Sequence, residues 1–205
     1  MKITLSNTGK RFNREWIFRN VNFDFDTGGK YAVLGPNGSG KSTFLQTIAG
    51  NLIASEGNII YNTSNGNIVS SEECYQYLSI CAPYMQLIEE FSLNEMIAFH
   101  ARFKPLMLKR NIAEMLLLSG TENKQIRYFS SGMKQRVKLG LALLSDVPLV
   151  ILDEPLTNLD DNGKLWYYTL IEKYGNNKTI LVGSNRPEEY PFAQSVINIT
   201  DYKFK

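Results

Sequence analysis

The sequence predicts an α/β fold in which a parallel central sheet is joined by an N-terminal antiparallel β subdomain and a helical subdomain. Three observations support this prediction. A glycine-rich loop, residues 35–42, lies between an apolar run and a helical-looking segment. Two largely apolar runs, 148–152 and 178–182, are typical of parallel strands that are buried on both faces. Between 92 and 119 the apolar spacing changes to that of helices.

Composition sets the frame for these elements. The chain has 205 residues, enough for one core and a small subdomain, and we expect a single domain over 1–205 with its helical subdomain at about 84–127. A hydrophobic fraction of 43% is ordinary, and a net charge of +2 predicts no polyanion-binding surface and hence no nucleic-acid partner. Cys74 and Cys81 lack metal-like spacing, so we expect reduced, structural thiols, which suit a cytosolic protein.

The sequence offers no segment that resembles a membrane span or a signal peptide. Residues 1–6 lack a long apolar region. No apolar run approaches the roughly 18 residues that a membrane span needs. Any role at a membrane is therefore expected to depend on a partner.

The chain opens with two β-like segments, 2–6 and 21–26, in which apolar and polar residues alternate. The stretch 10–16 between them looks exposed and holds two aromatic residues, Phe12 and Trp16. The other features of this part are a glycine turn at 28–29, a helix stop at Gly50, a strand at 57–61 and a turn at 62–67.

The glycine-rich loop matches the pattern G-x-x-x-x-G-K-[ST] in its strand–loop–helix context, and it predicts a P-loop NTPase core. Glycines let successive N–H groups point into one concavity, and the following helix adds the positive end of its dipole. Lys41 is expected to contact the β- and γ-phosphates, and the Ser42 hydroxyl to ligate Mg²⁺. The expected nucleotide-binding residues here are Gly35, Pro36, Asn37, Gly38, Ser39, Gly40, Lys41, Ser42 and Thr43.

Helical spacing follows in two segments. Leu93, Met96, Ile97 and His100 fall at i, i+3, i+4 and i+7, and 107–118 carries a second apolar side. His100 is the only histidine. Its place on an apolar face favours a packed or rim residue over a ligand or base.

The first of the two apolar runs ends at Asp153 and Glu154, and the second ends at 183–185. Because ligands bind at the carboxyl ends of strands in such sheets, we expect these ends and the glycine-rich loop to meet at one edge. Asp153 is suited to hold Mg²⁺ beside Ser42, and Glu154 to polarise the water that attacks the γ-phosphate. The alternative is a pair of solvated acids at a strand end, which the preceding phosphate loop disfavours.

After the glycine-rich loop and the acidic pair, the segment 128–136 is the third stretch that indicates a function. Ser130 or Ser131 is a natural N-cap, and apolar residues follow at helical spacing. First turns usually favour acidic residues, whereas here three cations lie between Lys134 and Lys138. This helix start is either an anion site or a plain capped helix with a basic, solvated face.

With these motifs in order, the sequence resembles the nucleotide-binding subunits of ABC transporters over essentially the whole chain. The loop matches Walker A, and Val147 to Glu154 matches Walker B with its catalytic glutamate. Residues 129–133 lie where the LSGGQ signature belongs, and 156–160 looks like the D-loop. The order of these motifs, with a helical lobe before the signature, is specific to this family. The small size is similar to that of compact bacterial subunits, including the ATPase subunits of haem exporters.

The resemblance implies an ATPase in which each ATP is held between two copies of the chain, packed head to tail. One copy gives Walker A and the other gives the signature. Lys41, Glu154 and Asn185 take the catalytic positions. ATP favours the closed dimer and ADP does not, because the contacts need the γ-phosphate. The residues implied to meet the nucleotide from the second copy are Ser130, Ser131 and Gly132.

The resemblance also implies a transmembrane permease as partner, which places the chain in the cytoplasm at the inner face of the cell membrane. Residues 84–88 are either the surface that receives this permease or part of the core. An aromatic ring is expected to stack on adenine. Phe12 lies where the family's A-loop aromatic falls, Trp16 is the alternative, and a core role for either stays open.

Three positions depart from the family pattern. The signature reads Phe-Ser-Ser-Gly-Met, the Q-loop glutamine falls at Pro83 with Gln86 out of register, and the switch histidine falls at Asn185. Asparagine donates a hydrogen bond but has no titratable charge, so we expect slower or less pH-sensitive turnover. Two alternative functions are a soluble ABC-type ATPase acting on ribosomes or DNA and a nucleotide-sensing module with weak turnover. The near-neutral charge argues against the first, and Glu154 against the second.

Overall fold

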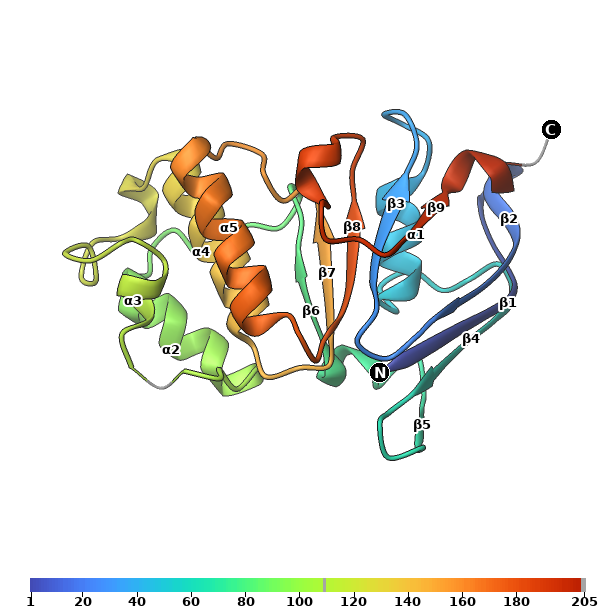
Figure 1. Ribbon diagram of the computed structural model, residues 1–205, viewed down its shortest axis with the longest axis horizontal. Coiled ribbons are helices and arrows are strands. Elements are labelled where there is room, and N and C mark those ends of the chain that lie inside the picture. Colours follow the sequence, from blue (N-terminus) through green and yellow to red (C-terminus); the bar gives the residue numbers. More distant parts are fainter. Residues whose placement is uncertain (109, 204–205) are drawn as a thin grey trace.

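The computed structural model describes residues 1–108 and 110–203 (Figure 1). Its strands are β1 (Lys2–Phe12), β2 (Glu15–Phe25), β3 (Lys30–Leu34), β4 (Glu56–Asn62), β5 (Ile68–Val69), β6 (Leu78–Cys81), β7 (Leu149–Asp153), β8 (Thr179–Gly183) and β9 (Ser195–Asn198). Its helices are α1 (Lys41–Ile48), α2 (Leu93–Phe103), α3 (Ile112–Met115), α4 (Ser131–Leu144) and α5 (Asp161–Tyr174). Short 3-10 turns are η1 (Cys74–Tyr77), η2 (Ile126–Tyr128), η3 (Pro187–Glu189) and η4 (Ile199–Tyr202).

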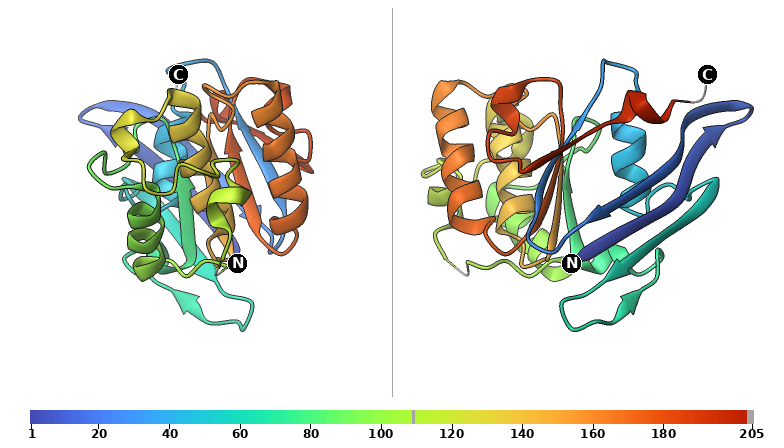
Figure 2. Two further views of the ribbon diagram at one scale, coloured as in Figure 1. Left: turned by 90° about the vertical axis from the view of Figure 1, so that its left-hand side faces the viewer. Right: turned by 45° about the vertical axis from the view of Figure 1, so that its right-hand side comes forward.

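The strands form two sheets, and the predicted fold class is confirmed. One sheet is antiparallel with strand order β2-β1-β4-β5, and the other is parallel with order β6-β7-β8-β3-β9. Helices α4 and α5 lie on one side of the parallel sheet, and α1 and the antiparallel sheet lie on the other (Figures 1 and 2). The order β7-β8-β3 puts the three predicted functional strand ends next to one another.

The antiparallel sheet is built on a β1–β2 hairpin that is longer than the sequence pattern predicted. The two strands pair from Ile3 and Phe25 to Phe12 and Glu15, with several register shifts between. Asn13 turns the chain at the tip in a left-handed conformation, with φ 53°. The aromatic stretch that the sequence marked as exposed is therefore the end of a hairpin.

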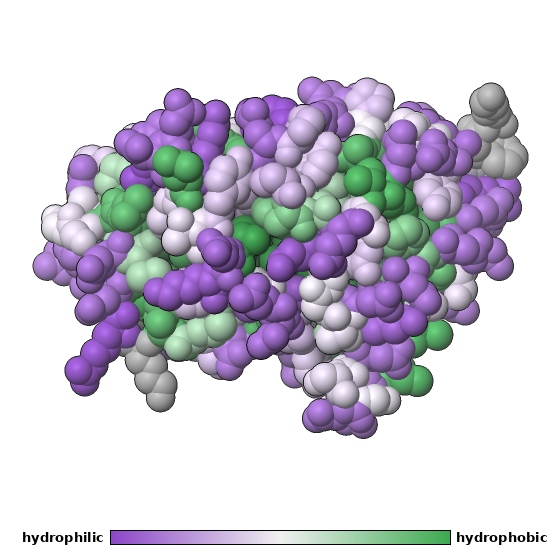
Figure 3. Space-filling model, viewed as in Figure 1, coloured by the Kyte–Doolittle hydropathy of each residue, from purple (hydrophilic) through white to green (hydrophobic). Residues whose placement is uncertain are grey.

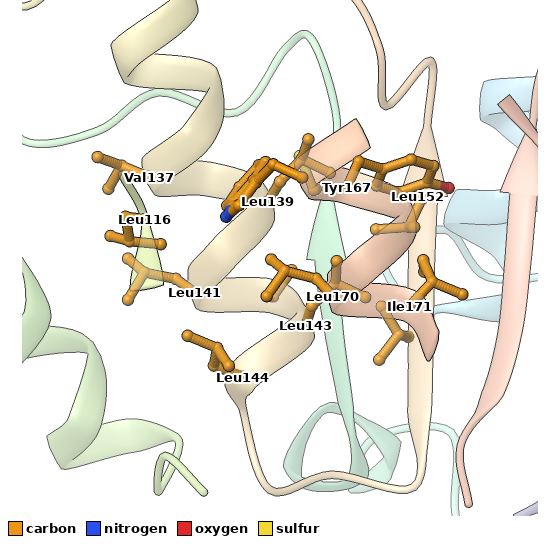
Figure 4. Close-up of a cluster of buried hydrophobic side chains, with 14 of the residues drawn as sticks. Leu116, Val137, Leu139, Leu141, Leu143, Leu144, Leu152, Tyr167, Leu170 and Ile171 are labelled. Carbon is orange, nitrogen blue, oxygen red and sulfur yellow. The ribbon is translucent and has the colours of Figure 1, made fainter. Parts of the chain in front are cut away.

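The parallel sheet is buried through its middle, as the two largely apolar runs predicted. Every residue of β7 and β8 is buried. Val150 and Leu152 pack among side chains of α4 and α5 (Figure 4), whereas Leu149 and Ile151 pack among those of α1 and the hairpin. Each such side chain contributes roughly 1.5–3 kcal/mol when fully buried. Packing from both faces fixes the carboxyl end of β7, where the acidic pair lies.

The first of the two predicted helices of the helical part is confirmed. α2 begins with a capping box: Ser92 Oγ accepts from the Glu95 N–H, and the Glu95 carboxylate accepts from the Ser92 N–H at 2.7 Å. Such a cap stabilises a helix start by about 1 kcal/mol.

The second predicted helix, 107–118, is wrong in extent, because only α3 is helical there. Asn111 and Leu117 have left-handed φ values of 59° and 56°, so the helix is confined between them. Met107 instead donates its N–H to the carbonyl of Leu144, in an extended contact beside the end of α4. Lys109, within the predicted helix, lies outside the described residues.

His100 and the two cysteines pack as expected from the sequence. His100 Nε2 lies 2.8 Å from the Ser145 hydroxyl, which itself donates to the carbonyl of Leu141. Burial, and to a smaller extent the nearby Lys104 charge, lowers the pKa of His100 to about 4. Cys74 and Cys81 are both free and buried.

The face of the molecule drawn in Figure 3 is mostly hydrophilic. Figure 3 shows hydrophilic residues over much of one face, with hydrophobic residues in smaller groups between them. Among the described residues, no helix combines the length and the apolar character that a membrane span requires.

Candidate nucleotide-binding site

The loop between β3 and α1 has a backbone that requires glycine at two points. Gly35 and Gly40 have φ values of 147° and 106°, which side chains disfavour. A Cβ at Gly40 would lie 2.4 Å from Cγ2 of Ile17, and one at Gly35 would lie 2.5 Å from Oγ of Ser39. Among the described residues no side chain caps the start of α1, so its first amides are left for a ligand. This arrangement suits an anion.

Lys41 is held over this loop. It is 6% exposed, and its Nζ donates to the carbonyl oxygens of Gly35 at 2.7 Å and Pro36 at 3.3 Å. An ammonium group has three donors, so one remains for a ligand. The positive charge is therefore placed at the loop before any anion arrives.

A hollow of about 240 Å³ lies in front of the loop. A larger hollow, about 570 Å³, opens at the opposite ends of β7 and β8 and is lined by none of the predicted site residues. The residues that line the smaller hollow, rather than its volume, therefore identify it as the candidate site. Its lining residues are Ile17, Asn37, Gly38, Gly40, Lys41, Ser42, Thr43 and Glu154.

Asp153 ends β7 and is buried beside the loop. It is 2% exposed, and its Oδ1 has no hydrogen-bond partner among the described residues. Burial raises the pKa of Asp153, a hydrogen bond with Ser42 opposes that rise, and the Glu154 charge adds to it. A carboxylate oxygen without a partner, beside a serine hydroxyl, is the hard oxygen donor set that Mg²⁺ prefers. The residues present therefore fit this ion.

Glu154 has different surroundings from Asp153. Its backbone is left-handed, with φ 48°, and its N–H donates to the carbonyl of Gly183 at 2.9 Å. Such a conformation costs about 1–3 kcal/mol in a residue other than glycine. The side chain lines the hollow, whereas Asp153 stays buried at the sheet edge. The acidic pair is thus not a pair of solvated acids.

Asn185, just after β8, contacts the same loop. Its Oδ1 accepts from the Gly35 N–H at 3.2 Å, and its Nδ2 lies 3.4 Å from Oδ1 of Asn37. The amide orientation follows from these two contacts. The ends of β3, β7 and β8 therefore meet at one edge, as the sequence predicted.

The start of α4 is a capped and open helix end. Ser130 Oγ accepts from the Met133 N–H at 3.2 Å, and both Ser130 and Ser131 are exposed. Gly132 lies against the neighbouring segment, because a Cβ there would be 3.0 Å from the carbonyl oxygen of Asn158. Hydroxyl and backbone groups at this end are therefore accessible to a ligand from outside.

The three cations of α4 do not form the anion site that the sequence left open. Lys134 pairs with Glu89, and Arg136 pairs with Asp160 at 3.1 Å. Lys138 Nζ lies 3.5 Å from the carbonyl oxygen of Ala82. Any anion affinity at this end comes from the serine hydroxyls and the first amides rather than from side-chain charge.

The start of α4 and the phosphate loop lie at the same edge of the molecule but apart from each other (Figures 1 and 2). α4 lies on one side of the parallel sheet, whereas the loop leads from β3 into α1 on the other side. Within one chain, the structure therefore brings together the loop, Asp153, Glu154 and Asn185, and it does not bring Ser130 to them.

The hairpin register separates the two aromatic candidates. Phe12 is two residues from the partner of Phe18, so it shares the face on which Phe18 packs against α1. Trp16 pairs with Arg11 on the opposite face, where the guanidinium groups of Arg11 and Arg19 lie 5.4 and 4.5 Å from its ring centroid. Phe12 is 46% exposed, which is incompatible with a core role.

The sequence analysis missed two residues of this region. Ile17 packs against the loop at Gly40, and its position depends on the hairpin bulge rather than on any motif. Gln135 is buried and donates from Nε2 to the carbonyl of Pro155 at 2.8 Å, which ties α4 to the residue after Glu154. Its only signal was a polar residue on the apolar side of a helix.

The loop, the buried aspartate and the converging strand ends define a P-loop nucleotide-binding protein. The model of the ABC transporter family matches residues 18–157. The chain is also 31% identical to the energy-coupling factor transporter ATP-binding protein EcfA1 of Thermotoga maritima, over 98% of this chain and 79% of that protein. The chain therefore belongs to the ABC transporter family, and it is an ATP-binding and ATP-hydrolysing subunit of such a transporter.

Solved structures have the same fold. An ABC transporter ATP-binding protein from Pyrococcus furiosus superposes with a TM-score of 0.84 at 21% identity, and the match covers 100% of both chains. A dimeric bacterial ABC transporter cassette superposes with a TM-score of 0.81 at 22% identity, over 96% of this chain and 94% of that one.

Proposed function

We propose that this subunit works as a homodimer of head-to-tail chains and drives a transmembrane permease from the cytoplasmic face of the cell membrane. The observation that carries the proposal is the separation of the exposed Ser130 helix end from the phosphate loop of the same chain. A second chain, turned head to tail, brings its own Ser130 end to the first chain's loop. We also propose that 1–205 form one ATPase domain, with its helical subdomain at about 84–127. The narrower similarity to the ATPase subunits of haem exporters stays a prediction.

The proposed roles follow the surroundings of each side chain. The loop amides bind the phosphates, and Lys41 uses its remaining donor on the γ-phosphate. Glu154, which lines the hollow, orients and deprotonates the attacking water. Asn185 donates its amide hydrogen to the γ-phosphate, and Phe12 stacks on adenine.

Ser42 and Asp153 would hold Mg²⁺. The support is the Asp153 Oδ1 atom, buried and without a partner among the described residues, beside the Ser42 hydroxyl. A bound Mg²⁺ would neutralise charge on the β- and γ-phosphates. Because burial raises the pKa of Asp153, the affinity for the ion should fall on acidification earlier than at an ordinary aspartate.

In the dimer, Ser130, Ser131 and Gly132 meet the γ-phosphate across the interface. Their hydroxyl and amide donors bind ATP without side-chain charge, because Lys134 and Arg136 are paired elsewhere. ADP lacks the γ-phosphate and so leaves the two chains free to part.

We propose that residues 84–88 form part of the surface that contacts the permease. Tyr84 and Met85 are 48% and 40% exposed, so the alternative of complete burial in the core is wrong for them. Leu87 and Ile88 pack partly against the core. A hollow of about 110 Å³ beside them is lined mostly by apolar side chains from β6, α2 and α4, which suits one apolar side chain of a docked partner helix.

Complementation of two inactive variants tests the shared site. Lys41→Ala removes the loop cation, and Ser130→Asp keeps a good N-cap but places a negative charge where the γ-phosphate should arrive. Each variant alone should lose most ATPase activity. Mixed in equal amounts, they should recover activity, because a head-to-tail dimer of one of each has one site with both Lys41 and Ser130.

The control is a mixture of Lys41→Ala with a chain that carries both substitutions, which has no intact site. ATP binding by Ser130→Asp alone, measured with a fluorescent analogue, should stay near the wild-type value. Activity that no mixture restores would count against the head-to-tail arrangement.

A further inference from the structure

Glu189 is an acidic residue buried at the end of the turn after β8. It is 0% exposed, and its Oε1 accepts from the backbone N–H of Leu156 at 3.3 Å. The same oxygen pairs with the Arg186 guanidinium, and Oε2 has no hydrogen-bond partner among the described residues. A buried carboxylate costs several kcal/mol, which even a good ion pair often does not offset. Stability alone therefore does not account for Glu189.

The contacts of Glu189 join two functional segments. Leu156 follows Glu154 by two residues, in the segment that leaves β7. Arg186 directly follows Asn185, in the segment that leaves β8. One carboxylate oxygen thus contacts a group from each segment, and the phosphate loop takes no part in this link.

Hydrogen bonds from α5 hold the backbone of this turn, and they do not involve the Glu189 carboxylate. The Tyr167 hydroxyl of α5 donates to the carbonyl oxygen of Glu189 at 2.9 Å. The Tyr168 hydroxyl donates to that of Glu188 at 2.6 Å. Removal of the Glu189 carboxylate therefore leaves both tyrosine contacts in place, so variants at Glu189 should fold.

We infer that Glu189 is a positioning residue for ATP hydrolysis: with Arg186, it holds the Glu154 segment in register with the Asn185 segment. The inference rests on the proposed roles of Glu154 and Asn185. A small misplacement of a catalytic group affects the rate far more than it affects binding, since a shift of about 1 Å costs about a hundredfold. ATP binding relies on the loop and Lys41, which Glu189 does not contact.

The test compares Glu189→Ala and Glu189→Gln with Glu188→Gln in the full-length chain. Glu188 is the matched control, because it lies in the same turn and its side chain is 49% exposed, with an oxygen 3.9 Å from Arg186. Steady-state ATP hydrolysis gives kcat and KM, and a fluorescent ATP analogue gives affinity. Thermal unfolding and circular dichroism give the folded fraction.

Glu189→Ala should lower kcat about 10- to 100-fold with KM and analogue affinity within about twofold. Glu189→Gln keeps an acceptor for the Leu156 N–H and should recover part of the loss, to about threefold below wild type. Glu188→Gln should match wild type. This split between kcat and KM, with rescue by the conservative variant, separates positioning from loss of fold.

Two results would overturn the inference: an unchanged kcat in Glu189→Ala, or a kcat that falls only in proportion to the folded fraction. If Glu189→Ala does not fold, Glu189→Gln and Arg186→Gln decide, and wild-type rates in both would overturn it. A wild-type chain that binds ATP without hydrolysing it would instead contradict the proposed role of Glu154, and the inference would fall with it.

Discussion

The starts of α1 and α4 lie at the same edge of the molecule and differ in how they can bind an anion. α1 follows a glycine loop and has no side-chain cap among the described residues, and Lys41 is buried in its first turn. α4 is capped by Ser130, is open to solvent, and has its nearest cations paired with carboxylates. The start of α1 therefore offers a buried positive charge beside free amides, whereas the start of α4 offers only exposed hydrogen-bond donors.

Under the proposed head-to-tail arrangement, this difference explains why each ATP site needs two chains. In that proposal the α1 end holds the triphosphate, because the loop amides and Lys41 converge there and Asp153 would hold Mg²⁺ beside them. The α4 end offers an anion no unpaired charge from Lys134 or Arg136, so we propose that it completes a site only when the nucleotide is already fixed on another chain. Binding and closure are therefore separate steps, and variants should separate them.

Glu154→Gln should give the largest effect, because it leaves both helix ends intact and removes only the base. We expect ATP hydrolysis to fall at least about a hundredfold, within the usual range for losing a general base. ATP affinity should stay near wild type, and the closed dimer should accumulate. Phosphate release measures the first, and size-exclusion chromatography in Mg²⁺ and ATP measures the dimer.

Glu172→Gln is a matched control, since Glu172 is an exposed glutamate on α5 away from the hollow. It should hydrolyse ATP at the wild-type rate. A Glu154→Gln chain that kept wild-type turnover would remove the distinction between Glu154 and Asp153 on which the roles depend.

Acid should destabilise the chain through His100, which packs at the far end of α4. The pKa of His100 is about 4 in the folded chain, against about 6.5 when unfolded. The folded state binds fewer protons between these values, so stability is lost as pH falls through that range. From pH 7 to pH 5 this one group should cost about 2 kcal/mol of unfolding free energy.

Urea unfolding at the two pH values measures this loss, and His100→Gln provides the control. Glutamine can donate to Ser145 Oγ but does not titrate. The variant should show a smaller drop between pH 7 and pH 5 than wild type. Equal drops in the two proteins would mean that other groups, such as the carboxylates, account for the acid sensitivity.

The phosphate-loop end could be predicted from sequence because its chemistry is local. The glycines, Lys41 and Ser42 are contiguous, and the acidic pair follows an unbroken apolar strand. The choice between Phe12 and Trp16 was not local, since it depends on a register shift in the hairpin. The pairing of the α4 cations was not local either, because their partners come from distant segments.

Some elements gave no usable pattern. β6 and β9 have four residues each, too short for periodicity to mark them. Buried polar groups were also hidden: Lys178 is 5% exposed, and its Nζ donates to the carbonyl of Leu143 at 2.7 Å, near the end of α4. In the sequence it is the first residue of the predicted strand 178–182, and nothing there shows what its ammonium group contacts. Its role depends on where α4 ends in space.

Asn185→His should give the smallest effect, and it adds to the α1 end the titratable group that the family places there. Asn185 contacts the loop through Gly35 and Asn37 but carries no charge. We expect histidine to raise kcat a few-fold, at the low end of general acid–base effects, and to make the rate depend on pH around about 6.5. Wild type should lack that dependence.

Rates measured from pH 6 to pH 8 test this prediction, with Asn185→Ala as the variant that removes the amide without adding a base. An identical rate and pH profile in Asn185→His would mean that this position does not reach the γ-phosphate, and that the α1 end relies on Lys41 and the loop amides alone.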